Sequence, residues 1–348
     1  MIKIDLQSLT KDELKEELSG LGLPKFRFDQ IYSWLAMYTD IMEMSNLPKD
    51  IREKLSEKYT STPVEIVKVF KSKKDPTQKF LFKMQDGEIV EGVLMNYKYG
   101  NTLCVSSQVG CRMGCKFCAS GLDGLIRNLT AGEILSQVLA VNKYMGGTIE
   151  DRQVTNIVLM GSGEPLDNYD NVVKFIKLVS SADGINISQR NISLSTCGLA
   201  SRIKDLTDED LNITLTISLH STTDSGRQNI MKVAKAYSLN ELFDAIRYYY
   251  NKTKRRIVFE YIMLPENTTK ADAERLKKLT AGISAHINLI PVNSTPSNMK
   301  KITKADQTAF WEELKAVGLS ATTRRTLGED IEGACGQLRR RFLKEGEN

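Results

Sequence analysis

The chain has 348 residues, of which 41% are hydrophobic and 26% are charged, a composition typical of globular proteins and unlike that of disordered ones. No apolar run reaches the roughly 20 residues that span a membrane, and the first residues lack the apolar core of a secretory signal. The net charge of +5 is too small to identify a polyanionic partner by itself. We therefore expect one large domain, or one domain with an appendage, located in the cytoplasm.

Residues 1–60 are expected to form a small helical accessory domain. Five leucines are spaced like one face of an amphipathic helix: Leu6, Leu9, Leu14, Leu18 and Leu21. The sequence Gly22-Leu23-Pro24 would end this helix, and further helices are expected over residues 26–35 and from Pro48 onward. The domain could serve as a packing cap or as a surface that contacts a substrate, and the sequence favours neither interpretation.

Residues 61–100 change to a strand-like pattern. Apolar residues alternate, or nearly so, over residues 64–70, 79–84 and 89–95. The sequence Gln85-Asp86-Gly87 between the second and third segments is typical of a hairpin turn. We predict that these residues form a β-hairpin extension of the core that follows.

Residues 101–348 alternate between short apolar strands and helical segments. The strands are expected over residues 103–106, 156–160, 191–195, 211–219, 258–263 and 287–291. The clearest helix covers residues 129–144, where Thr130 and Glu133 have the spacing of a capping box. This alternation predicts an α/β fold with a parallel sheet and right-handed crossovers. Six such units predict a partial (β/α)6 barrel.

Six cysteines occur in the chain, and three of them, Cys111, Cys115 and Cys118, form a C-x3-C-x2-C pattern. Clustered cysteines in a cytoplasmic protein indicate metal or redox chemistry rather than disulfides. Three thiolates on one loop can bind three irons of a [4Fe-4S] cubane and leave the fourth iron open. A zinc site is the alternative, but it needs a second pair of ligands, and the chain has only two histidines and no second such pair.

With Phe117 before its third cysteine, this loop resembles that of the radical S-adenosylmethionine (SAM) superfamily. The resemblance implies that Glu164 and a backbone carbonyl near Gly163 accept hydrogen bonds from the SAM ammonium group. Polar residues at successive strand ends of a barrel also suggest a ligand site, although each could be a cap or turn residue. The residues expected to bind this cofactor are Gly163, Glu164, Ser195, Ser218, Leu219, His220 and Asn293. For His220, a neutral hydrogen-bonding role and a cofactor contact remain equally open.

Nearly the whole chain resembles the RlmN family of rRNA and tRNA adenine-C2 methyl synthases. The resemblance rests on residues 103–111, on Gly163-Glu164-Pro165-Leu166 and, above all, on the closing motif at residues 328–338. That motif places the lone Cys335 far from the three clustered cysteines. The sequence departs from the family pattern at Cys197, where serine is commoner, and at Ser162, where methionine is commoner.

The family resemblance implies a route that uses two SAM molecules per turnover, because carbon 2 of adenine is electrophilic and has no acidic hydrogen. One SAM methylates the Cys335 thiolate, and a 5′-deoxyadenosyl radical from the second removes a hydrogen atom from that methyl group. The carbon then adds to adenine. Glu91 is expected to be the general base that removes the proton from the substituted carbon. Cys104 is expected to attack Cys335 and form a transient disulfide.

The resemblance also implies the partners. The RNA targets are an adenosine at the peptidyl-transferase centre of 23S rRNA and the adenosine 3′ of the anticodon in tRNA, both of which must leave their stacks. A flavodoxin-type protein is the expected reductant, and a monomer is the expected state. Three basic clusters could meet phosphates or could be solvated surface: residues 252–256, 324–325 and 339–341.

Two alternatives to this interpretation remain open. The first is a Cfr-like enzyme that methylates carbon 8 of the same rRNA adenine, with the same cluster and closing motif. The stretch Ile290-Pro291-Val292-Asn293 and the arginines Arg339 and Arg340 favour the C2 enzymes. The second is a non-catalytic, zinc-containing ribosome-assembly factor, which would leave the cysteine spacing and Cys335 unexplained.

Overall fold

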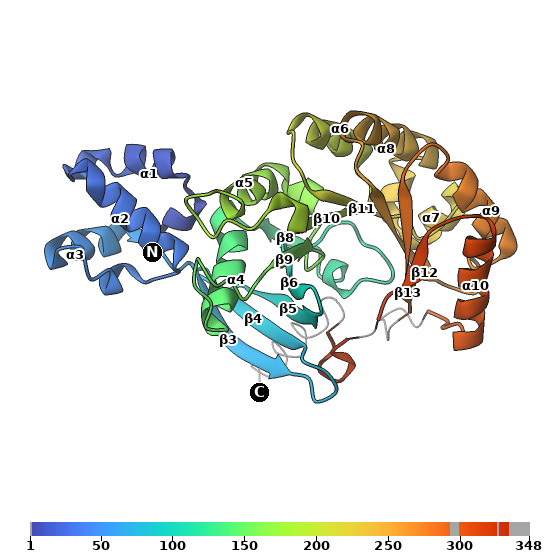
Figure 1. The fold of residues 1–348 in the computed structure, drawn as a ribbon, viewed down its shortest axis with the longest axis horizontal. Helices are drawn as coiled ribbons and strands as arrows, with labels where there is room; N and C mark the ends of the chain where they lie inside the picture. Colours follow the sequence, from blue (N-terminus) through green and yellow to red (C-terminus); the bar gives the residue numbers. More distant parts are fainter. Residues whose placement is uncertain (1, 293–298, 326, 334–348) are drawn as a thin grey trace.

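The computed structural model describes residues 2–292, 299–325 and 327–333, and a ten-stranded sheet forms its centre (Figure 1). The strand order is β14-β13-β12-β11-β10-β9-β6-β5-β4-β3. All strands from β6 to β14 in this order are parallel. They are β6 (Gly100–Val105), β9 (Asn156–Leu159), β10 (Ile192–Thr196), β11 (Thr214–Ser218), β12 (Ile257–Met263), β13 (Ala285–Pro291) and β14 (Ala321–Thr323). The six predicted strands are confirmed, and the short strand β14, which was not predicted, lies beside β13 at the edge of the sheet.

Helices connect the parallel strands and lie along the outer face of the sheet (Figure 1). They are α4 (Ala131–Tyr144), α5 (Tyr169–Val179), α6 (Ala200–Asp208), α7 (Asp224–Ile230), α8 (Leu239–Thr253), α9 (Lys270–Leu279) and α10 (Lys304–Ala316). The capping box of Thr130 and Glu133 at the start of α4 is confirmed. None of the helices described is long and apolar enough to cross a bilayer.

The two faces of the parallel strands differ in chemistry because successive side chains point to opposite sides. On β12, Phe259 belongs to the main hydrophobic core and stacks on Phe243 of α8, with ring centroids 5.7 Å apart. Its neighbour Glu260 points to the other side, into the concave face of the sheet, where Asn288 donates a hydrogen bond to it. The outer face is therefore the packed core, and the inner face is free to carry polar groups.

Three antiparallel strands extend the sheet beyond β6: β3 (Val64–Lys71), β4 (Gln78–Met84) and β5 (Ile89–Tyr97). All three predicted strands are present. A separate hairpin, β7 (Gln108–Gly110) with β8 (Leu125–Asn128), carries the cysteine loop between its strands. The extension and the core therefore share one continuous sheet.

The N-terminal region has its own hydrophobic cluster, which includes Leu6, Leu14 and Leu55. Its helices are α1 (Lys11–Glu17), α2 (Lys25–Ala36) and α3 (Lys49–Lys58). The prediction of one continuous helix through the five leucines was wrong. A 3-10 turn at Leu6–Ser8 precedes α1, because the Thr10 side chain caps a new helix start. The region is also not wholly helical, since β1 (Ile4–Asp5) pairs with β2 (Tyr59–Thr60).

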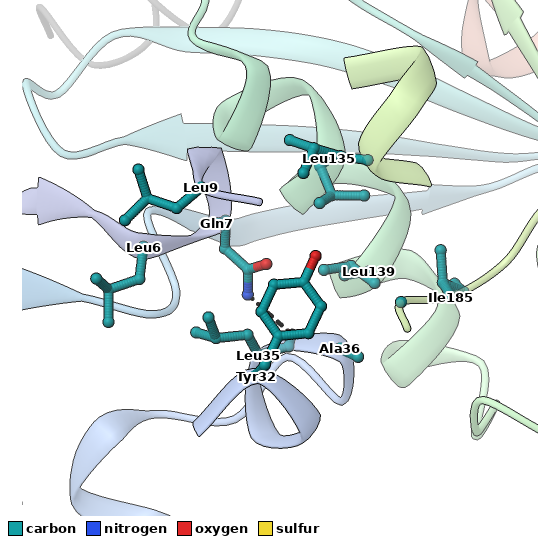
Figure 2. Close-up of a pocket in the computed structure, with 11 residues that line it drawn as sticks. Leu6, Gln7, Leu9, Tyr32, Leu35, Ala36, Leu135, Leu139 and Ile185 are labelled. Atoms are coloured by element: carbon teal, nitrogen blue, oxygen red, sulfur yellow. Dashed lines mark hydrogen bonds between the residues drawn. The ribbon is translucent and has the colours of Figure 1, made fainter. Parts of the chain in front are cut away.

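The N-terminal region packs on α4 along a mostly apolar seam, drawn in Figure 2. The Gln7 side chain is one of the few polar groups in this seam. Its Nε2 donates hydrogen bonds to the carbonyls of Leu35 and Ser61, at 2.9 and 2.8 Å. Leu135 and Leu139 of α4 face it. The cavity left there has a volume of about 20 Å³, which holds at most one water. The seam is therefore a packing contact between the N-terminal region and α4, and not a ligand site.

Candidate active site

The cysteine loop lies at the carboxyl ends of the parallel strands, where α/β barrels carry their sites. The N–H of Cys111 donates to the carbonyl of Gly124 at 2.9 Å, and the N–H of Lys116 donates to that of Ile230 at 2.9 Å. Gly110 has a φ of +75°, and a Cβ there would lie 2.1 Å from the Gly124 oxygen. Glycine is therefore required at this position for the loop to close.

The thiols of Cys111, Cys115 and Cys118 are free and near one another. Burial, followed by the nearby carboxylate of Glu164 and the Cys118 thiol, raises the pKa of Cys111 to about 12. A bound metal would reverse that preference, because it binds the thiolate. Burial likewise raises the pKa of Cys115.

In the described part of the chain, no three His, Cys, Asp or Glu side chains converge as the ligands of a single ion do. A cubane binds each thiolate through a different iron. The three neighbouring thiols, on a loop closed by glycine, are a donor set that could hold three irons of such a cluster.

His220 packs against the cysteine loop from the end of β11. Its ring meets Phe117 edge-on, with centroids 4.6 Å apart and planes at 75°. Its Nδ1 accepts from the N–H of Ile262 at 3.1 Å. Burial, with a smaller contribution from Arg227, lowers the pKa of His220 to about 3. The imidazole is therefore neutral at physiological pH, and its Nε2 carries the proton.

Glu164 ties two strand ends together. Its Oε1 accepts from the N–H of Leu166 at 3.0 Å, and its Oε2 accepts from that of Cys197 at 2.7 Å. Burial raises the pKa of this carboxyl group. Gly163 has a φ of +107°, and a Cβ there would lie 2.6 Å from Cβ of Gln108. The side chains of Thr196 and Cys197 also form hydrogen bonds with this carboxyl group.

The structure brings six of the seven expected cofactor residues to the carboxyl ends of β9, β10 and β11: Gly163, Glu164, Ser195, Ser218, Leu219 and His220. The seventh, Asn293, lies outside the described residues. The Leu219 side chain is fully buried in the main core. Its N–H donates to the carbonyl of Glu260 at 3.0 Å. Its carbonyl accepts from Nε of Arg227 at 3.0 Å and from the N–H of Ser221 at 2.8 Å, so both backbone polar groups of Leu219 are engaged within the protein.

Arg227 is a residue of this site that the sequence did not reveal. Its guanidinium is fully buried and donates to the carbonyls of Leu219 and Cys197, at 3.0 and 2.8 Å. Its Nη1 has no hydrogen-bond partner. Its charge opposes the rise in the pKa of Cys115. An isolated arginine in a seven-residue helix carries no sequence signal for this role.

A second group of expected residues lies on the antiparallel side of the sheet. Cys104 on β6 stands opposite Val93 on β5, and Glu91 lies two residues from Val93 on the same face. Diagonal positions of this kind are roughly 7–8 Å apart. Cys104 packs with Val93, Met95 and Leu327. The sheet therefore places the expected base and the expected resolving cysteine on one face.

Lys79 on β4 joins this group, and it was not predicted. Its Nζ lies 3.0 Å from Oε2 of Glu91, and the two side chains are only 1% and 8% exposed. Nζ also donates to the carbonyl of Glu332 at 2.8 Å. Strand parity could not have shown that Lys79 is buried, because Lys83 has the same parity as Lys79 and is exposed.

Residues 327–333, here called the closing segment, are held by the β3–β4 turn at residues 72–77. The Asp330 carboxylate accepts from the Ser72 hydroxyl at 2.6 Å and from the N–H of Lys73 at 2.7 Å. The N–H of Gly328 donates to Oδ2 of Asp75 at 2.9 Å. Figure 1 shows this segment in red beside the blue turn. Cys335 follows Gly333 by two residues in the sequence and lies outside the described residues.

The basic cluster at residues 252–256 lies away from the cysteine loop, at the amino end of β12. Lys252 pairs with Asp208 at 2.7 Å, and Arg256 donates to the Ser320 hydroxyl at 2.8 Å. Arg324 and Arg325 follow β14, and the cluster at 339–341 lies outside the described residues. The first cluster is therefore largely engaged in contacts within the protein.

Two family models match the chain. One, described as "Radical SAM superfamily", matches residues 105–279, which include the cysteine loop and most of the barrel strands. The other, described as "Ribosomal RNA large subunit methyltransferase N-terminal domain", matches residues 4–60, the region with the separate hydrophobic cluster.

Several relatives match over nearly their full lengths. A "Probable dual-specificity RNA methyltransferase RlmN" of Clostridium perfringens (strain 13 / Type A) is 49% identical over 98% of both chains. The protein of that name from Clostridium botulinum (strain Alaska E43 / Type E3) is 50% identical over 97% of both. The crystal structure of a radical SAM methyltransferase from Sphaerobacter thermophilus superposes with a TM-score of 0.91 at 38% identity, covering 96% of this chain and 98% of that one.

Proposed function

We propose, because the chain belongs to the RlmN family of dual-specificity RNA methyltransferases in the radical SAM superfamily, that it methylates carbon 2 of adenosine in RNA. The substrates are the adenosine at the peptidyl-transferase centre of 23S rRNA and the adenosine 3′ of the anticodon in tRNA. The observation that carries this proposal is the docking of the closing segment on the face that holds Glu91 and Cys104. That docking brings Glu332, which precedes Cys335 by three residues in the sequence, to the Lys79–Glu91 pair.

Cys111, Cys115 and Cys118 would hold a [4Fe-4S] cluster, and the ends of β9, β10 and β11 would hold SAM. When bound, the cluster supplies an electron for SAM cleavage, and two SAM molecules per turnover supply a methyl group and a 5′-deoxyadenosyl radical. The neutral His220 and the engaged carboxylate of Glu164 suit the recognition of a polar nucleoside. Neither residue needs to change protonation at this site.

In this proposal Cys335 carries the methyl carbon, and two residues release the product from it. Glu91 accepts the proton from the substituted adenine carbon, which a buried carboxylate beside a lysine is placed to do. Cys104 attacks the Cys335 sulfur as a thiolate and forms a disulfide while the carbon–sulfur bond breaks. The released carbon keeps the electron pair of that bond and takes up a proton, which completes the methyl group on adenine. A cellular reductant then restores both thiols.

The proposal extends to partners. Both RNA targets occur in the cytoplasm, where we place the enzyme, and it acts as a monomer with a flavodoxin-type electron donor. The adenine must leave its stack to reach the carboxyl ends of the strands. Arg324 and Arg325, which follow β14, are better placed than residues 252–256 to meet the RNA backbone.

The decisive experiment is anaerobic reconstitution of the enzyme with iron and sulfide, followed by incubation with SAM, a reductant and either an rRNA fragment or tRNA. Digestion and mass spectrometry then identify the methylated nucleoside. We expect 2-methyladenosine with the wild type and none with Cys335→Ala, with similar iron content in both proteins.

Three other results would revise the proposal. A peak of 8-methyladenosine would move the enzyme to the Cfr-like alternative with the same mechanism. SAM cleavage without a methylated base would mean that the substrate is wrong. Bound zinc without SAM cleavage would favour the non-catalytic assembly factor, which the names of the relatives do not support.

A further inference from the structure

We propose that Lys79 is a positioning residue that couples the base Glu91 to the closing segment, an inference that rests on the proposed function of Glu91 and Cys335. Its ammonium lies 3.0 Å from the Glu91 carboxylate and donates to the carbonyl of Glu332 at 2.8 Å. It thus contacts both the expected base and the chain three residues before the expected catalytic cysteine.

The burial of this contact argues for a purpose beyond stability. Lys79 and Glu91 are nearly inaccessible to solvent. A buried ion pair is often no more stabilising than an apolar pair of the same volume. Lysine is therefore not the residue that packing alone would select beside Phe80 and Leu81 on a buried strand. An ammonium is instead suited to hold a carboxylate that must be ionised before it can accept a proton.

The docking of the closing segment does not depend on Lys79. The turn at residues 72–77 already holds it through Asp330 and Asp75, and Leu327 packs against the cluster around Cys104. The bond from Lys79 to the Glu332 carbonyl adds a link between the segment and the Glu91 carboxylate.

This arrangement predicts a selective defect. Methyl transfer from SAM to Cys335 requires no base at Glu91, so this half-reaction should survive the loss of Lys79. Release of the RNA from the enzyme requires Glu91 to be in place, so it should fail. A covalent protein–RNA adduct should therefore accumulate when Lys79 is changed, as it should in Glu91→Gln.

The test compares Lys79→Gln, Lys79→Met and Lys79→Arg with the wild type and with Lys83→Met, a control on an exposed position of the same strand. Intact-protein mass spectrometry measures the methyl group on Cys335, and a denaturing gel measures the RNA adduct. Nucleoside analysis measures 2-methyladenosine. We expect normal Cys335 methylation, a product yield at least tenfold lower and accumulated adduct in Lys79→Gln. Arginine should restore most of the yield, and Lys83→Met should match the wild type.

Folding is controlled by circular dichroism and iron content. Because Lys79→Met removes the ammonium from beside a buried carboxylate, that variant could unfold. Lys79→Gln keeps a donor for both contacts and remains informative in that case. A folded Lys79→Gln with wild-type yield and no adduct would overturn the proposal, as would a folded variant that fails to methylate Cys335. If the wild type forms 2-methyladenosine without ever methylating Cys335, the proposed mechanism fails and this inference fails with it.

Discussion

The cysteine loop and the face that carries Glu91 are built in opposite ways. The loop draws its three thiols from eight consecutive residues and is closed by backbone hydrogen bonds and by Gly110. The Glu91 face gathers residues from β4, β5 and β6 and from the closing segment, about 240 residues further along the chain. One site is a local motif, and the other exists only in the folded protein.

Because the two sites are built differently, substitutions in them should have different effects. The local loop has no substitute for a lost ligand, so loss of any one of its three cysteines should abolish the function of the whole loop. The closing segment is held by several separate contacts, many of them at the surface. Exposed contacts of this kind are individually weak. Damage there should be graded, and it should leave the loop intact.

The largest effect is expected for Cys115→Ala. Loss of one of three thiolates should prevent stable cluster binding, so iron content and RNA methylation should both fall to background. Cys197→Ser is the matched control, because Cys197 is buried near the loop but lies outside the three-cysteine motif. Iron analysis and the nucleoside assay measure both outcomes. Loss of iron in Cys197→Ser would show that the local motif is not sufficient.

An intermediate effect is expected for Gly328→Ala in the closing segment. Gly328 has a φ of +61°, and a Cβ would lie 2.9 Å from Cγ2 of Thr77. The left-handed conformation costs a non-glycine residue about 1–2 kcal/mol, and the contact with Thr77 adds to this cost where the closing segment meets the turn at residues 72–77. The methylation rate should therefore fall about tenfold while iron content stays unchanged. Gly318→Ala is the control, since its φ is +83° but no atom lies within 4 Å of the added Cβ. Equal losses in both variants would point to general strain instead.

The smallest effect at neutral pH is expected on the cysteine-loop side at His220, which makes stability depend on pH only as the solution becomes acidic. The pKa of His220 falls from 6.5 to about 3 in the folded protein, mainly through burial. The unfolded chain therefore binds a proton that the folded chain does not, and stability is lost as pH falls below 6.5. At pH 5 the loss is about 2 kcal/mol, at 1.36 kcal/mol for each pH unit.

His220→Asn should flatten this dependence. Asparagine tolerates the left-handed backbone of His220, whose φ is 59°, and offers an oxygen to the N–H of Ile262. Thermal melts of the cluster-free wild type and of cluster-free His220→Asn, recorded between pH 5 and pH 7, measure how the stability of each protein depends on pH. If both proteins lose the same stability over this range, another group titrates and the assignment to His220 is wrong.

Much of the fold followed from the sequence because its signals are short in range. Alternating apolar residues predicted β3, β4 and β5, and the Thr130 capping box predicted the start of α4. The same reasoning failed at the N-terminus, where leucine spacing alone could not show that Thr10 starts a new helix. The pairing of β1 with β2 was also hidden, since it joins residues more than 50 positions apart.

By itself the sequence determined the family, the barrel and the residue types of the candidate site, because the cysteine spacing and closing motif are read along the chain. The resemblance named Glu91, Cys104 and Cys335, but nothing in the residue order showed that the first two share a face. Only the tertiary structure revealed Lys79 between Glu91 and Glu332, and the buried Arg227 between the strand ends. Such partners are decided by strand register and by packing between distant segments, because a side chain's parity on a strand shows which face it takes but not what it meets there.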